Sequence, residues 1–442
     1  MTFANLNLTT QLLNALQDAG YTNPTTIQHK VYPIALGGRD VCGIAQTGTG
    51  KTFAYLLPLL KLWKYDKAKD PQILILVPTR ELVTQVVSAV QELTTYMSVT
   101  TIGVYGGVNM NTQKLTLEQG ADIIVATPGR VYDLMMVHAF KTKYIKKLVI
   151  DEVDEMLNLG FRTQLRNIMD FIPSKRQNLM FSATITEDVE ALMLTYFNDP
   201  IRVEAAPTGT PVENIAQQAY LMPNFNTKVN TLEYMLKQDA GMSKVLVFVS
   251  SKSLADELYA KLEPTFTGTI GIIHSNKEQN HRFNTVNQFH NGTYTVLIAT
   301  DIVARGIDVA EVSHVINFDV PEVPENYIHR IGRTGRYDKQ GIAITFVTKK
   351  EKPSIDLIES LMKYTIPVMP IPADVVISDV LIESEIPKIP MRNSFVKIKK
   401  AAEVGPAFHA KSAKNSKTNT IVRKKDRMQA KYGKPIKRSG KK

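Results

Sequence analysis

The chain has 442 residues, of which 44% are hydrophobic and 21% are charged, a composition that is ordinary for a globular protein. This length exceeds what one hydrophobic core usually supports, so we expect two or three domains. The single cysteine, Cys42, excludes an intrachain disulfide and indicates a reducing compartment, so we expect a cytoplasmic protein. We find no N-terminal signal sequence and no apolar run long enough to span a membrane, and therefore expect no membrane partner.

The net charge of +11 is concentrated at the C-terminal end of the chain. Residues 391–442 contain 17 Lys and Arg against two Asp and Glu, which leaves a charge of −4 on residues 1–390. Because this tail has few bulky apolar residues, we expect it to be largely disordered. A Lys-rich disordered segment favours sequence-independent contact with phosphates, although a purely solubilising tail fits the same composition.

Apolar runs of strand length recur along the chain, with helix-like segments between them. They lie at residues 73–77, 123–125, 148–150 and 179–181 in the first half, and at 245–249, 270–273, 296–298, 315–318 and 342–346 in the second. Continuous rather than alternating apolarity predicts strands that are buried on both faces, as in a parallel sheet covered by helices.

A stretch rich in Pro, Gly and Thr, residues 205–214, separates the two series of runs and predicts a linker. We therefore expect an α/β protein with two doubly wound parallel-sheet domains in tandem. We expect a first domain at residues 1–206, a linker at 207–211, a second domain at 212–365, a transitional segment at 366–390 and the basic tail at 391–442.

The first candidate site along the chain is a Gly-rich stretch, GIAQTGTGKTF, at residues 43–53. A strand that runs into a Gly-rich loop, followed by Lys-Thr at the start of a helix, is typical of a phosphate-binding loop. Its backbone amides would cradle phosphate, Lys51 would add a positive charge, and the Thr52 hydroxyl would hold Mg²⁺. The generic pattern has Gly at the position of Ala45, and a Gly-rich turn with an ordinary surface lysine is the alternative.

Two carboxylates follow directly after the predicted strand 148–150. A phosphate-loop enzyme needs one carboxylate to position Mg²⁺ and a second one to activate the attacking water, and we assign these roles to Asp151 and Glu152. Acids at the start of a helix also interact favourably with the helix dipole, which is the alternative explanation for the pair. We expect Glu155 to be no more than such a helix charge.

With these features in place, the chain resembles the DEAD-box ATP-dependent RNA helicases over about residues 1–365, and its motifs follow the family's order. The stretch AQTGTGKT at 45–52 has the family's form of the phosphate loop, in which Ala is usual at the first position. Upstream, GYTNPTTIQ at 20–28 resembles the family's adenine-recognition motif. The amide of Gln28 has a donor and an acceptor, which suits the N6 and N7 edge of adenine and favours ATP over GTP.

The resemblance implies that the fold is a pair of RecA-like domains and that ATP lies between them. The ATP-binding residues that it implies are Phe3, Gln28, Ala45, Gln46, Thr47, Gly48, Thr49, Gly50, Lys51, Thr52 and, as a ribose contact, Asp308. The implied magnesium-binding residues are Thr52 and Asp151, partly through water.

Further motifs imply contacts with RNA. The stretches PTREL at 78–82 and TPGR at 127–130 resemble RNA-binding motifs of the first domain, whereas VFVSS at 247–251, Gln279 and ATDIVARGID at 299–308 fit motifs of the second. The RNA-binding residues implied are Pro78, Thr79, Arg80, Gly107, Thr127, Arg130, Arg282 and Thr300. Because such groups mostly bind phosphate and sugar, we expect little sequence specificity.

The stretch HRIGRTGR at 329–336 resembles the family's last motif. Arg333 and Arg336, three residues apart across a Gly-containing turn, can present two guanidiniums to one phosphate of ATP. They belong to the second domain, so the active site would be complete only when the two domains close. Arg330 is expected to support the motif, and His329 fits either a link between the ATP and RNA sites or a packed histidine.

The remaining motifs concern coupling and departures from the family pattern. SAT at 182–184 resembles the segment that couples the ATP state to unwinding, so Asp154, Ser182 and Thr184 are assigned to coupling. Ser275 stands where Gly is common, and Val153 stands where Ala is usual. We expect Val153 to point into the core and to cause modest repacking. A caspase site, which DEVD also resembles, is disfavoured at a buried strand end.

The resemblance implies a monomeric RNA-dependent ATPase that uses ATP and Mg²⁺ for local, non-processive RNA unwinding or remodelling of RNA–protein complexes. The main alternative is a non-enzymatic ATP-gated RNA clamp, although Lys51, Asp151, Glu152, Arg333 and Arg336 are all present. A DNA helicase of the wider superfamily is disfavoured by the Gln28 motif. The compact size and Lys-rich tail resemble bacterial RhlE-type members.

Overall fold

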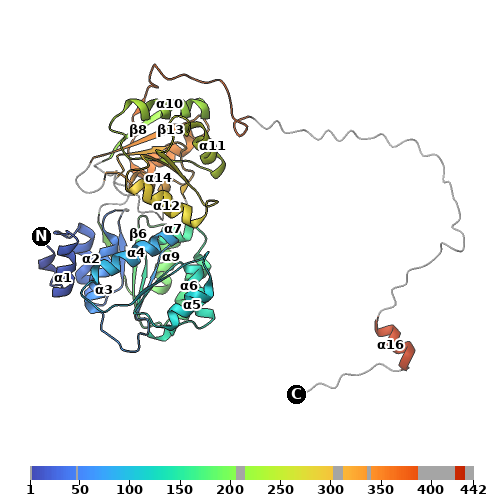
Figure 1. Ribbon diagram of the computed structural model, residues 1–442. Coiled ribbons are helices and arrows are strands. Elements are labelled where there is room, and N and C mark those ends of the chain that lie inside the picture. The colour runs from blue at the N-terminus through green and yellow to red at the C-terminus, as the bar shows by residue number, and fades with distance from the viewer. Residues whose placement is uncertain are drawn as a thin grey trace. The chain divides into compact units, whose positions relative to one another are not determined.

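The structure, a computed structural model, describes residues 2–45, 48–205, 215–301, 312–335, 340–386 and 424–433. The chain divides into two compact units, residues 1–386 and 387–442. The first unit contains two seven-stranded parallel sheets with helices on both faces, one after the other in sequence (Figure 1). The predicted fold class is therefore confirmed.

The first sheet has the strand order β3-β4-β2-β5-β6-β1-β7. Its strands are β1 (Val41–Ile44), β2 (Ile73–Leu76), β3 (Thr101–Val104), β4 (Ile123–Ala126), β5 (Lys147–Ile150), β6 (Gln177–Ser182) and β7 (Ile201–Glu204). The helices of this domain are η1 (Phe3–Leu6), α1 (Thr10–Asp18), α2 (Thr26–Leu36), α3 (Lys51–Leu62), α4 (Arg80–Leu93), α5 (Met110–Glu118), α6 (Pro128–Met136), η2 (Thr142–Tyr144), α7 (Val153–Asn158), α8 (Arg162–Phe171) and α9 (Glu187–Tyr196).

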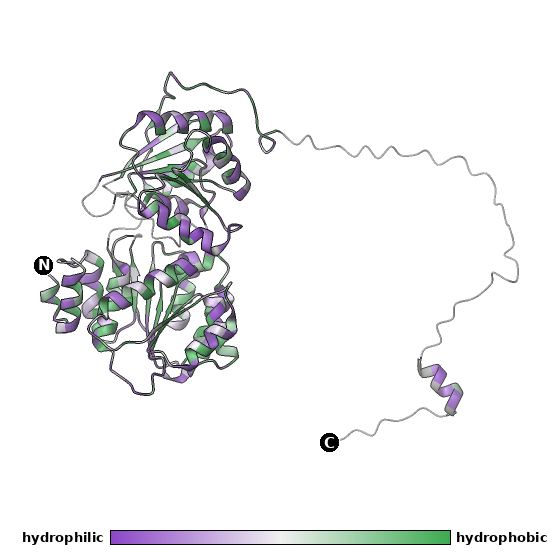
Figure 2. Cartoon of the chain, in the orientation of Figure 1, coloured by the Kyte–Doolittle hydropathy of each residue, from purple (hydrophilic) through white to green (hydrophobic). Residues whose placement is uncertain are grey.

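The central strands are apolar at every position because each of them contributes to two cores. Alternate side chains of a strand point to opposite faces of the sheet. In β2, Ile73 and Ile75 pack against α1, α2, α3 and α4, whereas Leu74 and Leu76 pack against the helices of the other face. The green strands between helices with purple outer faces show this arrangement (Figure 2).

The second sheet has the order β10-β11-β9-β12-β13-β8-β14. Its strands are β8 (Ile215–Leu221), β9 (Val245–Phe248), β10 (Ile270–Ile273), β11 (Val296–Ala299), β12 (His314–Asn317), β13 (Gly341–Val347) and β14 (Val368–Met369). Helices α10 (Phe225–Gln238) and α11 (Lys252–Leu262) cover one face, and the other face is covered by α12 (Gln279–His290), α14 (Pro324–Ile331) and α15 (Lys352–Met362).

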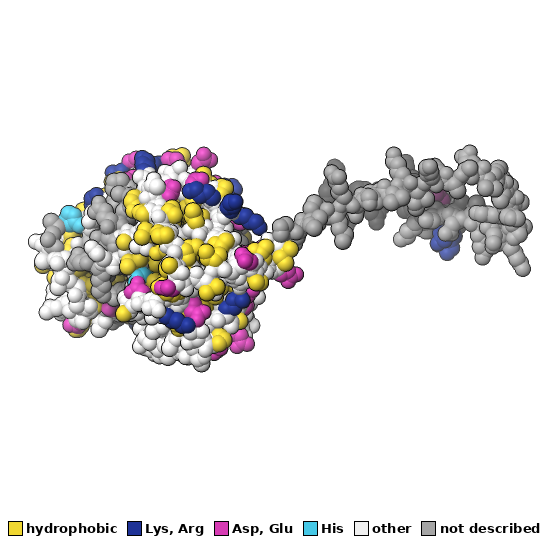
Figure 3. Space-filling model, turned by 90° about the horizontal axis from the view of Figure 1, so that it is seen from above, with side chains coloured by type: hydrophobic (Ala, Val, Ile, Leu, Met, Phe, Trp, Pro, Cys, Tyr) yellow, Lys and Arg dark blue, Asp and Glu magenta, His cyan; other side chains and the backbone are white. Residues whose placement is uncertain are grey.

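The chain continues along the second domain after α15. Strand β14 pairs with β8, and residues 370–386, which we call the strap, run along α10. The Nδ2 atoms of Asn226 and Asn230 donate to strap carbonyls, each at 2.7 Å, and Glu385 accepts from the Phe225 backbone N–H at 2.6 Å. The strap leaves apolar side chains in solvent, and hydrophobic side chains gather on the face that Figure 3 shows. Among the strap residues, Val376 is 71% exposed.

The predicted linker, 207–211, lies outside the described residues, as does most of the basic tail. In the tail the structure describes α16 (Lys424–Tyr432) and the residue after it. Within the described part of the chain, no helix combines the length and the apolarity that a membrane crossing requires.

Candidate active site and nucleic-acid interface

The carboxyl ends of the parallel strands of the first sheet bring the predicted ATP residues together. A cavity of about 780 Å³ lies at this edge, a volume in the usual range for small-molecule sites. Its walls include Lys51 and Thr52 at the start of α3, Asp151 and Glu152 after β5, and Arg333 after α14. Arg333 comes from the second domain, so both domains contribute to one cavity.

The phosphate loop meets α3 in a geometry that requires glycine. Gly50 has φ 86° and directly precedes Lys51, the first residue of the helix. A Cβ at Gly50 would overlap the Gln28 amide nitrogen. The Lys51 side chain is only 6% exposed, and its Nζ atom has no hydrogen-bond partner among the described residues. A buried ammonium without a partner at a helix N-terminus is suited to receive phosphate oxygens.

Gln28 connects the predicted adenine site to the phosphate loop. Its Oε1 accepts from the Thr25 backbone N–H at 3.0 Å, and its Nε2 donates to the Gly50 carbonyl at 3.1 Å. These contacts use one lone pair and one N–H, so a second acceptor site and a second donor remain on the same amide. Phe3 and Gly48 line the same cavity, whereas Gln46 and Thr47 lie outside the described residues.

The two carboxylates differ in their surroundings. Burial raises the pKa of Asp151, and Lys51 opposes this shift. Burial also raises the pKa of Glu152, to about 7, again against the effect of Lys51. A carboxylate whose pKa lies near neutrality is suited to accept a proton from water. Glu152 has φ 52° and ψ 49°, a left-handed backbone that is unusual outside glycine and that accumulates at functional sites.

The predicted magnesium residues fit a cation that binds mostly through other ligands. The described residues contain no group of three or more His, Cys, Asp or Glu side chains that could hold a metal ion by themselves. Mg²⁺ commonly takes one or two protein ligands and completes its shell with phosphate oxygens and water. The carboxylate of Asp151 and the hydroxyl of Thr52, which line the same cavity as the Lys51 ammonium, suit that pattern.

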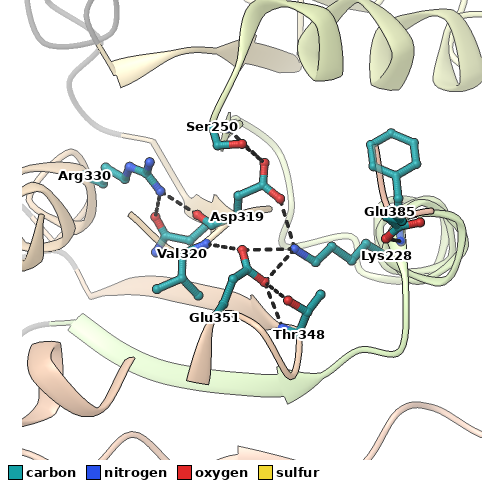
Figure 4. A network of polar contacts seen from close by, with 10 residues as sticks. Lys228, Ser250, Asp319, Val320, Arg330, Thr348, Glu351 and Glu385 are labelled. Atoms are coloured by element: carbon teal, nitrogen blue, oxygen red, sulfur yellow. Dashed lines mark hydrogen bonds and ion pairs between the residues drawn. The ribbon is translucent and has the colours of Figure 1, made fainter. Parts of the chain in front are cut away.

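Arg330 anchors α14, the helix that ends just before Arg333. Its guanidinium donates to both carboxylate oxygens of Asp301, at 2.6 and 2.8 Å, and to the Asp319 carbonyl at 2.7 Å. The Asp319 carboxylate accepts from the buried Lys228 ammonium at 3.0 Å and from Ser250 at 2.9 Å (Figure 4). These bonds stay within the second domain and fix the position from which its arginine reaches the cavity.

Two residues that the sequence assigned to this site, Arg336 and Asp308, lie outside the described residues. The cavity therefore has one described arginine of the predicted pair. The other predicted ATP-binding residues that the structure describes lie in the phosphate loop or next to it.

Asp154 links α7 to the SAT segment. Its Oδ2 atom accepts from the Ala183 backbone N–H at 3.1 Å, the Thr184 backbone N–H at 3.0 Å and the Thr184 hydroxyl at 3.0 Å. Burial alone would raise the pKa of Asp154, but His329, Lys51 and hydrogen bonds from the Thr184 and Ser182 side chains lower it.

Glu155 lies in the first turn of α7, but it is more than the helix charge that we expected. It is only 1% exposed, and its Oε1 atom lies 3.2 Å from His329 Nδ1, while His329 Nε2 lies 3.7 Å from Asp154 Oδ2. The expectation was wrong because the second domain covers this helix turn, which a local pattern cannot reveal. His329 thus contacts both acids of the first domain.

The predicted RNA residues of the first domain also follow strands of the sheet. Thr79 caps the N-terminus of α4, and its hydroxyl accepts from the Leu82 backbone N–H at 3.3 Å. Gly107, with φ 80°, leaves room for the Arg80 guanidinium, which a side chain there would displace. Arg130 donates to Gln113 and to the Val108 carbonyl. Pro78 and Thr127 are buried.

Arg282 differs from the other predicted RNA residues because it meets an acid of the opposite domain. Its Nη2 atom lies 2.5 Å from Glu81 Oε1, and both side chains are largely buried. Burial lowers the pKa of Arg282, and Glu81 opposes that shift. Glu81 lies inside PTREL, but sequence reasoning did not single it out. Thr300 lines another cavity, of about 850 Å³, together with Ser251 and Lys252.

Comparisons with known proteins agree with this geometry. The DEAD/DEAH box helicase family matches residues 25–192, and the helicase conserved C-terminal domain matches residues 227–338. DEAD-box ATP-dependent RNA helicase 14 of Arabidopsis thaliana is 39% identical over 82% of this chain and 59% of its own length. RNA helicase CrhR of Synechocystis is 39% identical over 84% of this chain and 75% of its own length. The chain spans only 34% to 59% of three plant relatives.

The structure of S. cerevisiae Dbp5 bound to RNA and ADP BeF3 has the same fold, with a TM-score of 0.77 and 30% identity. The match covers 84% of this chain and 96% of that one. The shared fold covers nearly all of the Dbp5 structure, and the 39% identity extends over most of CrhR. Both similarities agree with the motifs at the cavity. This chain belongs to the family of DEAD-box ATP-dependent RNA helicases.

Proposed function

We propose that the protein is an RNA-dependent ATPase that couples ATP binding and hydrolysis to local, non-processive unwinding of RNA duplexes or remodelling of RNA–protein complexes. One observation carries the proposal. A single cavity holds the buried Lys51 ammonium, which has no protein partner among the described residues, together with Asp151, Glu152 and the second domain's Arg333. This set supplies what phosphoryl transfer from ATP to water requires.

Each of these residues has a separate task. Lys51 and the backbone amides at the start of α3 bind the phosphates, while Asp151 and Thr52 would hold Mg²⁺. The cation neutralises phosphate charge when it is bound. Glu152 orients the attacking water and takes its proton, for which its pKa of about 7 is suited. Arg333, with Arg336 as its proposed companion, stabilises charge on the transferred phosphoryl group from the other domain.

RNA is the proposed macromolecular partner. The Dbp5 structure bound to RNA supports this, as do the predicted phosphate-binding groups of the first domain. Asp154 contacts both the SAT segment and His329. ATP binding and RNA binding would then involve the same residues, so that each can change the affinity for the other. In the same proposal the basic tail adds nonspecific RNA contact and the protein acts as a cytoplasmic monomer. Its compact size and Lys-rich tail resemble those of bacterial RhlE-type members.

The proposal is tested by ATP hydrolysis with and without RNA. We expect hydrolysis to be stimulated by RNA and to be lost in Glu152→Gln, which keeps the shape of the side chain and removes the base. Asp133→Asn, an exposed acid of α6, is the matched control and should leave the rate unchanged. Wild-type protein that binds RNA in the presence of ATP but hydrolyses no ATP with any RNA would instead be an ATP-gated clamp.

A further inference from the structure

Two lysine-rich loops lie side by side in the first domain, at the end of the sheet opposite the ATP cavity. Residues 63–72 lead from α3 into β2, residues 137–146 lead from α6 into β5, and these two strands are neighbours in the sheet. The Lys146 backbone N–H donates to the Gln72 carbonyl at 2.9 Å, so the loops, which we call the lysine loops, are in contact. Strand β5 starts at this surface, and Asp151 follows its other end.

The lysine loops are basic in a part of the chain that is not. Together they contain six Lys, two Asp and no Arg or Glu, a net charge of +4, whereas residues 1–390 as a whole carry −4. One of the lysines, Lys141, forms an ion pair with Asp70 at 3.2 Å, which also joins the two loops. The others are exposed and form no ion pair with the residues that the structure describes: Lys64, Lys67, Lys69, Lys143 and Lys146. A group of unpaired ammonium ions on one surface attracts anions.

Aromatic side chains are interleaved with these lysines. Tyr65 is 63% exposed, and its ring centroid lies 6.5 Å from that of Trp63, in an edge-to-face arrangement. In the other loop, the Nζ atoms of Lys143 and Lys141 lie 4.9 and 5.7 Å from the ring centroid of Tyr144. Solubility accounts for the lysines, but it does not account for an exposed ring among them. Tyrosine is enriched at interfaces, where its ring supplies a flat apolar surface.

This combination fits an unpaired nucleic-acid strand. Proteins bind such strands through a positively charged surface along the phosphates and through aromatic rings on which bases stack, with little dependence on sequence. We propose that the lysine loops are an accessory site for single-stranded RNA, in which Lys143 and Lys146 contact phosphates and Tyr65 stacks on an unpaired base. In a duplex the base faces are covered by their neighbours, so a duplex would contact the lysines alone.

The inference goes beyond the proposed function, because the lysine loops belong to the first domain alone. Neither the ATP cavity nor Arg333 of the second domain takes part in this surface. RNA binding at the lysine loops therefore does not require the two domains to close, and the accessory site can hold a strand without ATP.

The test measures RNA binding by the full-length protein without nucleotide, at several concentrations of NaCl. The probe is a fluorescein-labelled oligouridine of about 40 nucleotides, which is long enough to contact several sites at once. Each phosphate contact with a single strand contributes about 0.7 to the slope of log affinity against log salt. For Lys143→Gln/Lys146→Gln we therefore expect a weaker affinity and a slope that is smaller by about 1.4.

Lys261→Gln/Lys363→Gln provides the matched control. Lys261 is in the last turn of α11 and Lys363 follows α15; both are exposed, and neither forms an ion pair with a described residue. This control removes the same charge from the second domain and should leave the salt slope unchanged. The basic tail is present in every variant, so its contribution cancels in the comparison.

Tyr65→Ala tests the stacking contact separately. Loss of one stacked base should weaken binding of the oligouridine by at least about fivefold. Binding of a blunt RNA duplex should be unchanged, and so should the temperature of unfolding, because the ring is largely exposed. Equal affinities of wild type and Tyr65→Ala for the single strand, or an equal loss for the duplex, would overturn the stacking role.

The outcomes separate the accessory site from the proposed function. An unchanged salt slope for Lys143→Gln/Lys146→Gln would overturn the accessory site, even if RNA stimulates ATP hydrolysis normally. An equal change in the control would overturn it as well, since the effect would then follow from net charge alone. A change confined to the lysine loops would support the site, even in a protein that hydrolyses no ATP.

Discussion

The partly buried carboxyl of Glu152 should make the ligand-free protein less stable as the pH rises. Burial raises its pKa from the ordinary value of 4.5 to about 7, so the folded protein holds this proton more tightly than the unfolded chain does. The resulting stability is fully present below pH 4.5 and is lost as the pH rises through 7. Glu152→Gln cannot ionise and removes this dependence on pH.

The expected size follows from the shift in pKa. A difference of about 2.5 pKa units corresponds to about 3.4 kcal/mol in total, of which about 2 kcal/mol is lost between pH 5.5 and pH 8. Glu152 lines the cavity, and water there reduces the cost, so we expect about 1–2 kcal/mol over this range. For a domain of this size, that corresponds to roughly 3–6 °C in the temperature of unfolding.

The measurement is thermal unfolding of wild type and Glu152→Gln without nucleotide, from pH 5.5 to 8. As the pH rises, the temperature of unfolding of the wild type should fall by roughly 3–6 °C relative to that of the variant. The exposed acid in Asp133→Asn serves as the control, and its difference from wild type should stay constant. If the difference between wild type and Glu152→Gln is also constant within a degree, the carboxyl does not titrate in this range, and the reasoning from its burial is wrong.

Three other predictions follow from the same structure. Val153→Ala removes two methyl groups from a fully buried site, so the free energy of unfolding in denaturant should fall by about 1.5–2.5 kcal/mol. The ATPase rate of the folded protein should be unchanged, and a tenfold slower rate would mean that Val153 belongs to the active site. Glu81→Gln and Arg282→Gln should each reduce RNA-stimulated ATPase activity, and the double variant should be no worse than either one; additive losses would mean that Arg282 acts without Glu81. Deletion of residues 391–442 should weaken RNA binding and flatten its salt dependence at unchanged basal ATPase activity, and an unchanged salt slope would contradict the role of the tail.

The sequence predicts the strands that are buried on both faces and misses those that are not. The runs at 73–77 and 245–249 form β2 and β9, because such strands must be apolar at every position. In contrast, β7 (Ile201–Glu204) lies at a sheet edge and includes Arg202 and Glu204, so its pattern is that of a surface segment. The two-residue β14 has no pattern of its own, and its pairing depends on β8 being already in place.

The same distinction applies to the site. Lys51, Asp151 and Glu152 are predictable because local spacing after a strand specifies their chemistry. Glu155 is not, because in sequence it is an acid in a helix turn. Its partner, His329, comes from a segment far away in the chain, and only the packed structure brings the two together.

The strap also determines when, during synthesis, the second domain can be completed. Domains generally fold as units while the chain is being made. Strand β8 and helix α10 emerge early, but β14 and the carbonyls that accept from Asn226 and Asn230 are translated only after α15. Until then one side of β8 is an open edge, which is a template for pairing with a foreign strand. A nascent chain that stalls after residue 365 therefore carries an almost complete helicase domain with an unprotected edge.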